Sequence, residues 1–204
     1  MKRLLLLLFV LMLSSQTIVS AQNEAYTHDG FFVNLGLGLN FGTIKTEIEN
    51  VNSFKFTGAG TSLDLLIGVS PVENIILHAT IFGTGTANPK VDVNGTAQGN
   101  IEDTGVGTGM FGLGATFYTK DNFFLSPSIG RSIITLENDS ETIVSGGGLG
   151  VLLRAGKEWW VGKQWGVGFS IAYRGAFGVT DLGQGEEEEW SSSNFSIALS
   201  TTFN

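Results

Sequence analysis

Residues 159–180 read WWVGKQWGVGFSIAYRGAFGVT and alternate in character from Trp165 onward. Apart from Gly175, the odd positions carry large apolar side chains, and the even positions carry glycine, alanine, serine and one cation, Arg174. Because successive side chains of a β-strand point to opposite faces, the pattern predicts a strand with one apolar face and one small, polar face. In a soluble sandwich the apolar face would pack on a second sheet, whereas in a transmembrane barrel it would face lipid.

The same alternation recurs along the chain and predicts eight strands. They lie near residues 31–42, 56–69, 75–86, 105–119, 123–136, 142–161, 165–180 and 190–203. Long polar connections (43–55, 87–104, 137–141, 181–189) alternate with short turns, which is typical of outer-membrane barrels with short periplasmic turns and longer extracellular loops. We therefore predict an all-β fold, an eight-stranded antiparallel up-and-down transmembrane β-barrel.

The N-terminal residues have the three-part plan of a secretory signal peptide. Lys2 and Arg3 precede an apolar run over residues 4–13 and a polar stretch that ends at Ala21. The alternative, a membrane anchor, is disfavoured because a spanning helix needs about 20 apolar residues. We expect a cleaved signal peptide at residues 1–21, a barrel domain at residues 22–204, and location in the bacterial outer membrane of a Gram-negative envelope.

Composition narrows the functional classes further. The chain contains no cysteine, which excludes disulfides and thiolate metal sites. The formal net charge is −8 and only 15% of residues are charged, so we expect no nucleic-acid partner. The 29 glycines alternate with large apolar residues instead of gathering in linkers, so we assign them to strands.

Aromatic residues are expected to form two girdles where the barrel meets the membrane interfaces. On the side of the short turns the girdle would contain Phe31, Phe117, Phe123, Trp159, Trp165 and Phe203. On the side of the long loops it would contain Phe41, Phe177 and Trp190.

The chain from residue 22 onward resembles the small eight-stranded OmpA/OmpX-type outer-membrane barrels. The segment GKEWWVGKQWGVGFS, residues 156–170, is similar to a hairpin of outer-membrane barrel proteins of that broad class. The alternating apolar residues Phe195, Ile197, Leu199 and Phe203 resemble the C-terminal signal of such proteins, although Thr201 interrupts the series and Asn204 follows it. The resemblance implies a monomer whose partners are outer-membrane lipid, lipopolysaccharide and the outer-membrane assembly machinery.

Five ionisable residues fall on the predicted lumen face: Asp64, His78, Arg154, Glu158 and Arg174. Asp64 and Arg154 lie on opposite strands of an eight-stranded ring, at similar distances from the short turns, so they could meet across the interior. Charges in such a space need partners, which favours a paired internal plug. A gate or an ion-selective constriction is the alternative, because inward glycines leave room in the lumen.

Arg131 and Pro127 are unusual residues for a transmembrane strand such as the predicted fifth strand. Alternation places Arg131 on the outward face, near the top of the apolar band. Proline cannot donate to a strand ladder, so we expect a β-bulge at Pro127, and such a bulge would turn Arg131 into the lumen.

An enzyme is the competing functional class, because lipid-modifying outer-membrane barrels of similar size use histidine and serine at the outer rim. His78 is predicted near the short turn at residues 71–74, and the other histidine, His28, precedes the first strand. Without a histidine, serine and acid at one rim, we predict no enzymatic activity.

The acidic run Glu186, Glu187, Glu188 and Glu189 belongs to the last predicted loop. Four adjacent carboxylates lack the spaced ligands of a calcium loop, so we expect a solvated loop with no metal site and no cofactor. Most other acidic residues also fall on the loop side, where they could bridge to lipopolysaccharide through cations.

We predict a structural, envelope-interaction or surface-binding role for a barrel with a largely plugged lumen. The alternative is a narrow porin-like channel for small solutes or ions, and a lipid-modifying enzyme is the third hypothesis.

Overall fold

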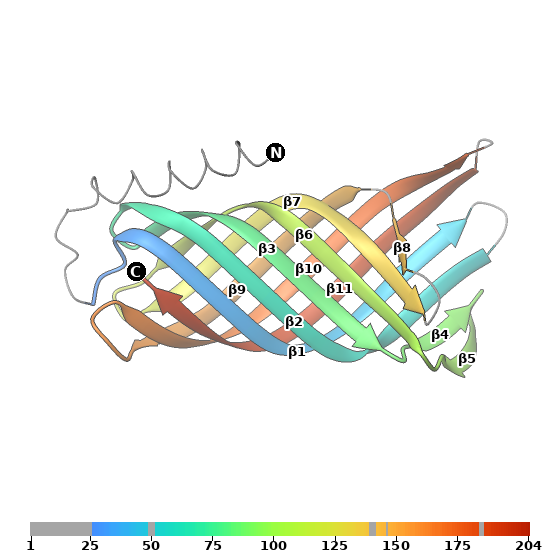
Figure 1. Cartoon of the computed structure of the whole chain (residues 1–204), viewed down its shortest axis with the longest axis horizontal. Helices are drawn as coiled ribbons and strands as arrows, with labels where there is room; N and C mark the ends of the chain where they lie inside the picture. Colours follow the sequence, from blue (N-terminus) through green and yellow to red (C-terminus); the bar gives the residue numbers. More distant parts are fainter. Residues whose placement is uncertain (1–25, 49–51, 139–141, 146, 184–185) are drawn as a thin grey trace, which may run out of the picture.

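The computed structural model describes residues 26–48, 52–138, 142–145, 147–183 and 186–204, and they form one closed antiparallel barrel (Figure 1). The ring contains eight strands: β1 (Gly30–Ile48), β2 (Asn52–Val72), β3 (Ile75–Ala87), β6 (Thr104–Tyr118), β7 (Phe123–Asn138), β9 (Gly148–Trp160), β10 (Trp165–Gly183) and β11 (Glu186–Phe203). Each strand pairs with its neighbours in the order β1-β11-β10-β9-β7-β6-β3-β2, and pairing of β1 with β2 closes the ring. The predicted eight-stranded barrel is confirmed. The predicted signal peptide, residues 1–21, lies outside the described residues.

Two ends of the barrel are distinguished by their connections. The turn end carries the three short turns β2–β3, β6–β7 and β9–β10, and the chain's C-terminus (Figure 1). In outer-membrane barrels this end faces the periplasm, and the opposite loop end faces outward. At the loop end, β1, β2, β10 and β11 extend well beyond the predicted strand limits, so much of the expected loops 43–55 and 181–189 is strand.

Additional short strands lie at the loop end. β4 (Lys90–Val93) and β5 (Thr96–Asn100) form a hairpin beside β2, and β8 (Thr142–Val144) pairs with β7. The sequence prediction of a plain loop at 87–104 is therefore wrong. The Asn94-Gly95 turn has positive φ at both residues, 52° and 81°, which is what a two-residue hairpin turn requires and what Asn-Gly supplies.

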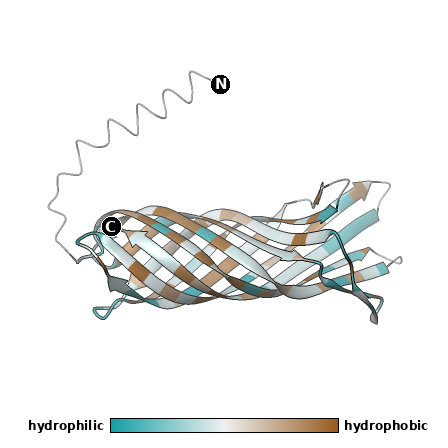
Figure 2. Ribbon diagram, turned by 60° about the horizontal axis from the view of Figure 1, so that its bottom comes forward, coloured by the Kyte–Doolittle hydropathy of each residue, from teal (hydrophilic) through white to brown (hydrophobic). Residues whose placement is uncertain are grey.

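The outer surface is apolar along the body of the barrel. On β1 the exposed side chains at odd positions run from Phe31 to Phe41, and Figure 2 shows hydrophobic residues along all of the barrel body. Ten residues at about 3.3 Å each, tilted by about 45°, span about 23 Å, which matches the apolar band of about 25 Å in transmembrane barrels. A soluble protein would not expose such a surface, so the chain is a transmembrane barrel.

No helix among the described residues has the length and apolar character needed to cross a bilayer.

The aromatic residues assigned to the girdles lie on the outer face of the barrel, with one exception. Seven of them have about half of their surface exposed on the outside: Phe31, Phe41, Phe117, Phe123, Trp159, Trp165 and Phe177. Phe203 is partly buried against the ring of Trp165, with the two ring centroids 5.2 Å apart. Trp190 is the exception, because it is 2% exposed and packs inside the barrel. Even-numbered positions of β11 face the lumen, so its assignment to the outer girdle was wrong.

The expected bulge at Pro127 does not form. Pairing of β7 with β9 continues without a shift through Ser126, Pro127 and Ser128, and the proline ring is exposed on the outer face. Pairing of β7 with β6 is absent between Leu125 and Ser128. Pro127, which has no backbone N–H, therefore does not have to donate a hydrogen bond to β6. Arg131 therefore keeps its outward orientation and is exposed.

Glycines allow three strands to approach one another on the lumen side. Gly112, Gly130 and Gly150 stand opposite one another on β6, β7 and β9. A Cβ atom at Gly130 would overlap the carbonyl oxygen of Phe111 and the Cα atom of Gly112. The close approach exists because these positions lack side chains.

We expect Gly130→Ala to lower the free energy of unfolding by about 1–3 kcal/mol, because the methyl group overpacks a backbone contact. The control is Gly83→Ala, where a Cβ atom would meet nothing within 4 Å, and it should be neutral or slightly stabilising. Urea unfolding in lipid vesicles measures both variants. Equal stability of the two would contradict the packing explanation.

Candidate functional site

An ion cluster crosses the lumen near the middle of the barrel. Both carboxylate oxygens of Asp64 on β2 accept hydrogen bonds of 2.7 Å from Nη2 of Arg174 on β10. Nε of Arg154, on the diametrically opposite strand β9, lies 3.7 Å from Asp64 Oδ2. The sequence indicated that Asp64 and Arg154 could meet, and the structure adds Arg174 as the nearer partner.

Neighbouring side chains complete the cluster. Arg154 Nη1 donates to Asn34 Oδ1 at 3.0 Å, and its guanidinium lies 5.6 Å from the ring centroid of Phe124. Arg174 donates to Ser196, and its guanidinium lies 5.5 Å from the ring centroid of Phe82. Asp64, Arg154 and Arg174 are all at most 1% exposed. A water-filled passage at this depth would wet them, so the lumen is packed with side chains here.

His78 and Glu158, which were also predicted to face the lumen, form their hydrogen bonds with uncharged side chains. Glu158 accepts hydrogen bonds from Thr202 Oγ1 at 2.6 Å and from Tyr118 Oη at 3.2 Å. The His78 ring contacts the hydroxyls of Thr80 at 2.9 Å and Thr116 at 3.0 Å. Both side chains are buried, so each is held in a polar network of the barrel wall.

His28 covers the turn end of the lumen, a role that the sequence did not reveal. Its ring stacks on Tyr118 with centroids 3.5 Å apart and lies 4.8 Å from Trp160. Its two nitrogens approach Oδ1 of Asn122 at 3.2 Å and Oδ1 of Asn204 at 3.3 Å. The segment before β1 therefore folds back onto the last residue of the chain.

Burial lowers the pKa of the His28 imidazole below its ordinary value, and hydrogen bonds to Asn204 and Asn122 oppose this less strongly. The folded pKa thus lies below the unfolded value of about 6.5, so acid favours release of the segment as the pH falls through and below 6.5. The amide of Asn74 donates to the His28 carbonyl at 3.1 Å and reports that release. After correction for the intrinsic rate, its hydrogen exchange should accelerate by up to about tenfold per pH unit below 6.5.

His28→Gln, which cannot titrate, is the control for this effect. It should abolish the pH dependence of Asn74 exchange. A profile that is as steep in the variant as in the wild type would contradict a role for the histidine.

An apolar cavity opens inside the barrel at the loop end. Its volume is about 370 Å³. Its walls are formed mainly by apolar side chains of β1, β2, β6, β7 and β8: Ile44, Phe54, Phe56, Val106, Ile134, Leu136, Ile143 and Val144. Ile44, Val106 and Ile134 also pack with Trp190, whose ring thus belongs to the same cluster. The sequence prediction missed this cavity because Ile44 and Phe54 lie beyond the expected strand limits, and alternation alone does not show how inward side chains of different strands pack.

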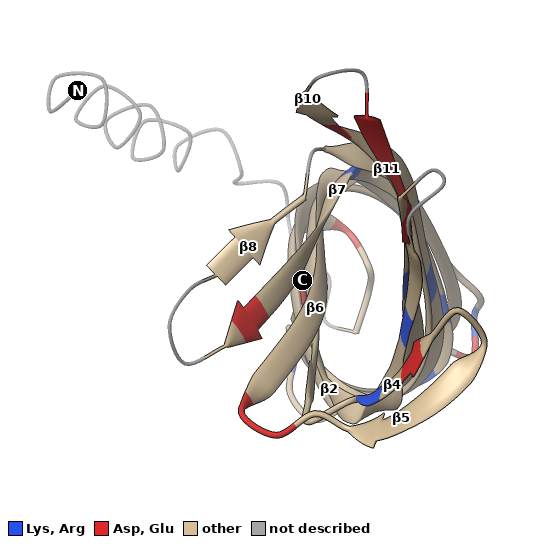
Figure 3. Ribbon diagram, turned by 90° about the vertical axis from the view of Figure 1, so that its right-hand side faces the viewer, with Lys and Arg blue, Asp and Glu red and all other residues tan. Residues whose placement is uncertain are grey.

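Acidic residues mark the strands around the loop end (Figure 3). The predicted acidic loop forms the first part of β11. Because successive side chains of a strand point to opposite faces, its glutamates are divided between the inner and outer faces of the barrel. Glu188 lines the inner apolar cavity, whereas Glu189 lines a hollow on the outer surface. Within the described part of the chain, no group of three or more His, Cys, Asp or Glu side chains is arranged to hold a metal ion.

The closed ring, its apolar outer surface and its polar, packed lumen define a small eight-stranded barrel of the outer-membrane type. No protein-family model matches the sequence, and a search of curated proteins finds no match. The solved structures that match are outer-membrane proteins of low sequence identity. Neisserial surface protein A is 14% identical over 85% of this chain and 96% of its own, with a TM-score of 0.49. OprG from Pseudomonas aeruginosa is 12% identical over 87% and 98%, with a TM-score of 0.48.

Ail, the attachment invasion locus protein of Yersinia pestis, is 9% identical over 86% of this chain and 99% of its own, with a TM-score of 0.45. These likenesses concern the fold alone. The role of this chain has to be argued from its own residues.

Proposed function

We propose that this protein is a non-conducting outer-membrane barrel that binds a small apolar molecule at its outward-facing mouth. The observation that carries the proposal is the division of the lumen into a sealed middle and an open end. Asp64, Arg154 and Arg174 are buried at mid-depth, while the apolar cavity lies above them at the loop end. A sealed barrel with an open mouth can receive a ligand but offers it no way through.

The chemistry of the cavity supports an apolar ligand. Its volume of about 370 Å³ is near the lower end of the range of small-molecule sites, about 300–1,000 Å³. Its wall is mainly aliphatic and aromatic, and its polar residues are Thr46, Thr135, Ser145, Thr180 and Glu188. Removing the apolar surface of a ligand from water is the main source of affinity that such a wall provides.

Trp190 allows a direct binding test, because the other three tryptophans, Trp159, Trp160 and Trp165, all lie near the turn end. A variant with these three changed to phenylalanine keeps Trp190 as the sole fluorophore. We expect 1-bromonaphthalene, an apolar quencher, to quench it saturably in lipid nanodiscs.

Ile134→Asn in this background should weaken the quenching about tenfold, since it places an amide in the apolar wall. Val179→Asn is the matched control, because Val179 is exposed on the outer face of the same rim. Trp190 quenching that increases linearly with the 1-bromonaphthalene concentration, and to the same extent in Ile134→Asn and Val179→Asn, would contradict binding at the mouth. Retention of the heat-dependent electrophoretic mobility shift verifies that each variant is folded.

The alternative, a narrow channel, requires the lumen to be open at mid-depth instead of sealed. It requires a continuous polar path past Arg154 and Arg174. Lipid modification is a weaker alternative, because the side chains that contact the His78 ring nitrogens are the hydroxyls of Thr80, Thr116 and Ser126, and His78 lies on the turn side of the barrel.

A further inference from the structure

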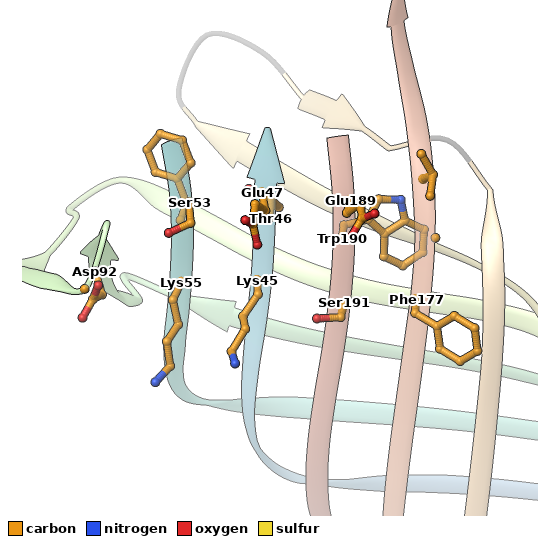
Figure 4. A pocket seen from close by; sticks show the side chains of 14 residues that line it. Lys45, Thr46, Glu47, Ser53, Lys55, Asp92, Phe177, Glu189, Trp190 and Ser191 are labelled. Atoms are coloured by element: carbon orange, nitrogen blue, oxygen red, sulfur yellow. The ribbon is translucent and has the colours of Figure 1, made fainter. Parts of the chain in front are cut away.

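The outer surface carries a hollow at the loop end, where β10, β11, β1 and β2 lie side by side. Two adjoining depressions of about 680 Å³ and 510 Å³ share Lys45, Lys55, Phe177 and Ser191 (Figure 4). These residues occupy odd positions, which face outward on all four strands. The shared lysines, Phe177 and Ser191 therefore lie on the outer face, while Thr46 and Phe54 border both this hollow and the apolar cavity at the mouth.

Two lysines form one side of the hollow. Lys45 and Lys55 are direct partners in the β1–β2 register, and like charges placed directly opposite each other are unfavourable. Both side chains extend in the same direction, back toward the body of the barrel (Figure 4). Within the described residues, no carboxylate oxygen lies within 4.0 Å of either ammonium group. The two lysines therefore form no direct ion pair, although Asp92 is the cross-strand neighbour of Lys55.

Two of the three acidic neighbours lie above the lysines, and the third lies beside Lys55. Glu47 and Glu189 face each other one step further from the membrane, and Asp92 is the register partner of Lys55 on the hairpin. Lys90 lies one step nearer the membrane, opposite Thr57. Carboxylates above the lysines repel anions that approach from the solvent, so an anion can reach the lysines more favourably from the membrane side.

The position of Lys45 and Lys55 relative to the membrane is consistent with an anion that approaches from the membrane side. Phe41 is the last residue of the apolar run on β1, and Lys45 follows four residues later. At about 3.3 Å per residue and about 45° tilt, the Lys45 backbone lies about 9 Å above Phe41. Since the side chains point back toward the band, the ammonium groups lie at the level of lipid headgroups.

The rest of the hollow suits a sugar. Tyr173 and Phe177 on β10 form the side opposite the lysines, and Ser191 and Ser193 lie between the two sides. Ser193 Oγ donates to Tyr173 Oη at 3.5 Å. Aromatic rings pack against the C–H faces of sugars, and serine hydroxyls can bind sugar hydroxyls or phosphate oxygens.

We propose that this hollow binds the phosphorylated sugar headgroup of a glycolipid in the outer leaflet. Lys45 and Lys55 hold the phosphate, and the aromatic side packs against the sugar. The proposal goes beyond binding at the mouth and does not depend on it, because Lys45 and Lys55 line the outer hollow and do not line the apolar cavity.

The test compares two lipids and two pairs of lysines. Wild-type barrel in nanodiscs of neutral lipid is titrated with bisphosphorylated lipid A or with its dephosphorylated form, and bound lipid is counted by native mass spectrometry. We expect Lys45→Gln with Lys55→Gln to weaken binding of the phosphorylated lipid about thirtyfold and to leave binding of the dephosphorylated lipid unchanged. Lys45→Arg with Lys55→Arg should retain binding.

The matched control is Lys120→Gln with Lys163→Gln, which removes two exposed lysines at the turn end. It should bind like the wild type. Equal binding by the Lys45/Lys55 variant, or equal weakening by the control pair, would overturn the proposal. Inorganic phosphate in millimolar excess should not displace the lipid. Displacement would identify a site for soluble anions and would overturn the assignment to a lipid.

Discussion

Asp64→Asn should lower the free energy of unfolding by about 3–5 kcal/mol, because it removes the charge that two buried arginines share. The carboxylate accepts two hydrogen bonds from Arg174 and faces Arg154 at 3.7 Å. Asparagine keeps the shape but removes the charge, which leaves two buried guanidinium groups without it. Urea unfolding in lipid vesicles measures the loss.

Asp121→Asn is the control for Asp64→Asn, because Asp121 is exposed in the short β6–β7 turn. It should change stability by less than about 0.5 kcal/mol. A loss below about 1 kcal/mol for Asp64→Asn would mean that the two arginines do not depend on this carboxylate.

Trp190→Ala should also be strongly destabilising, by about 3–5 kcal/mol, because the indole is 2% exposed and packs with Ile44, Val106 and Ile134. The matched control is Trp165→Ala, whose indole faces lipid on the outside and is half exposed. That substitution should cost clearly less, since it leaves no internal cavity. The same unfolding experiment compares them, and an equal or smaller loss for Trp190→Ala would contradict its place in the lumen.

The alternation of side chains was sufficient to predict the barrel, because a lipid-facing surface and a narrow lumen impose a strict period of two on every strand. The same rule would have placed Trp190 correctly. Phe195, Ile197 and Leu199 set the outward parity of β11, and an even-numbered residue on that strand faces inward. The girdle assignment relied on aromatic character alone and ignored that parity.

The loop end was harder to predict, because strands that project beyond the membrane no longer need an apolar outer face. Thr43, Lys45 and Glu47 continue the alternation of β1, but their polarity made the segment resemble a loop. For the same reason the sequence did not reveal that Lys45 and Lys55 face each other. The Asn94-Gly95 dipeptide was the available signal for the β4–β5 hairpin.

Pairing across the lumen was partly predictable. Strand order places β9 opposite β2, so Asp64 and Arg154 could be brought together from sequence. The closer contact with Arg174 depends on how the long side chains fold over Phe82 and Phe124, which alternation does not specify.

The most direct test of the sealed lumen is the conductance of the purified wild-type barrel in a planar bilayer. Our account predicts no steady unitary current, because the buried cluster of Asp64, Arg154 and Arg174 closes the lumen. A steady unitary conductance in the wild type, altered by Arg154→Ala, would contradict the sealed lumen and would favour the narrow channel.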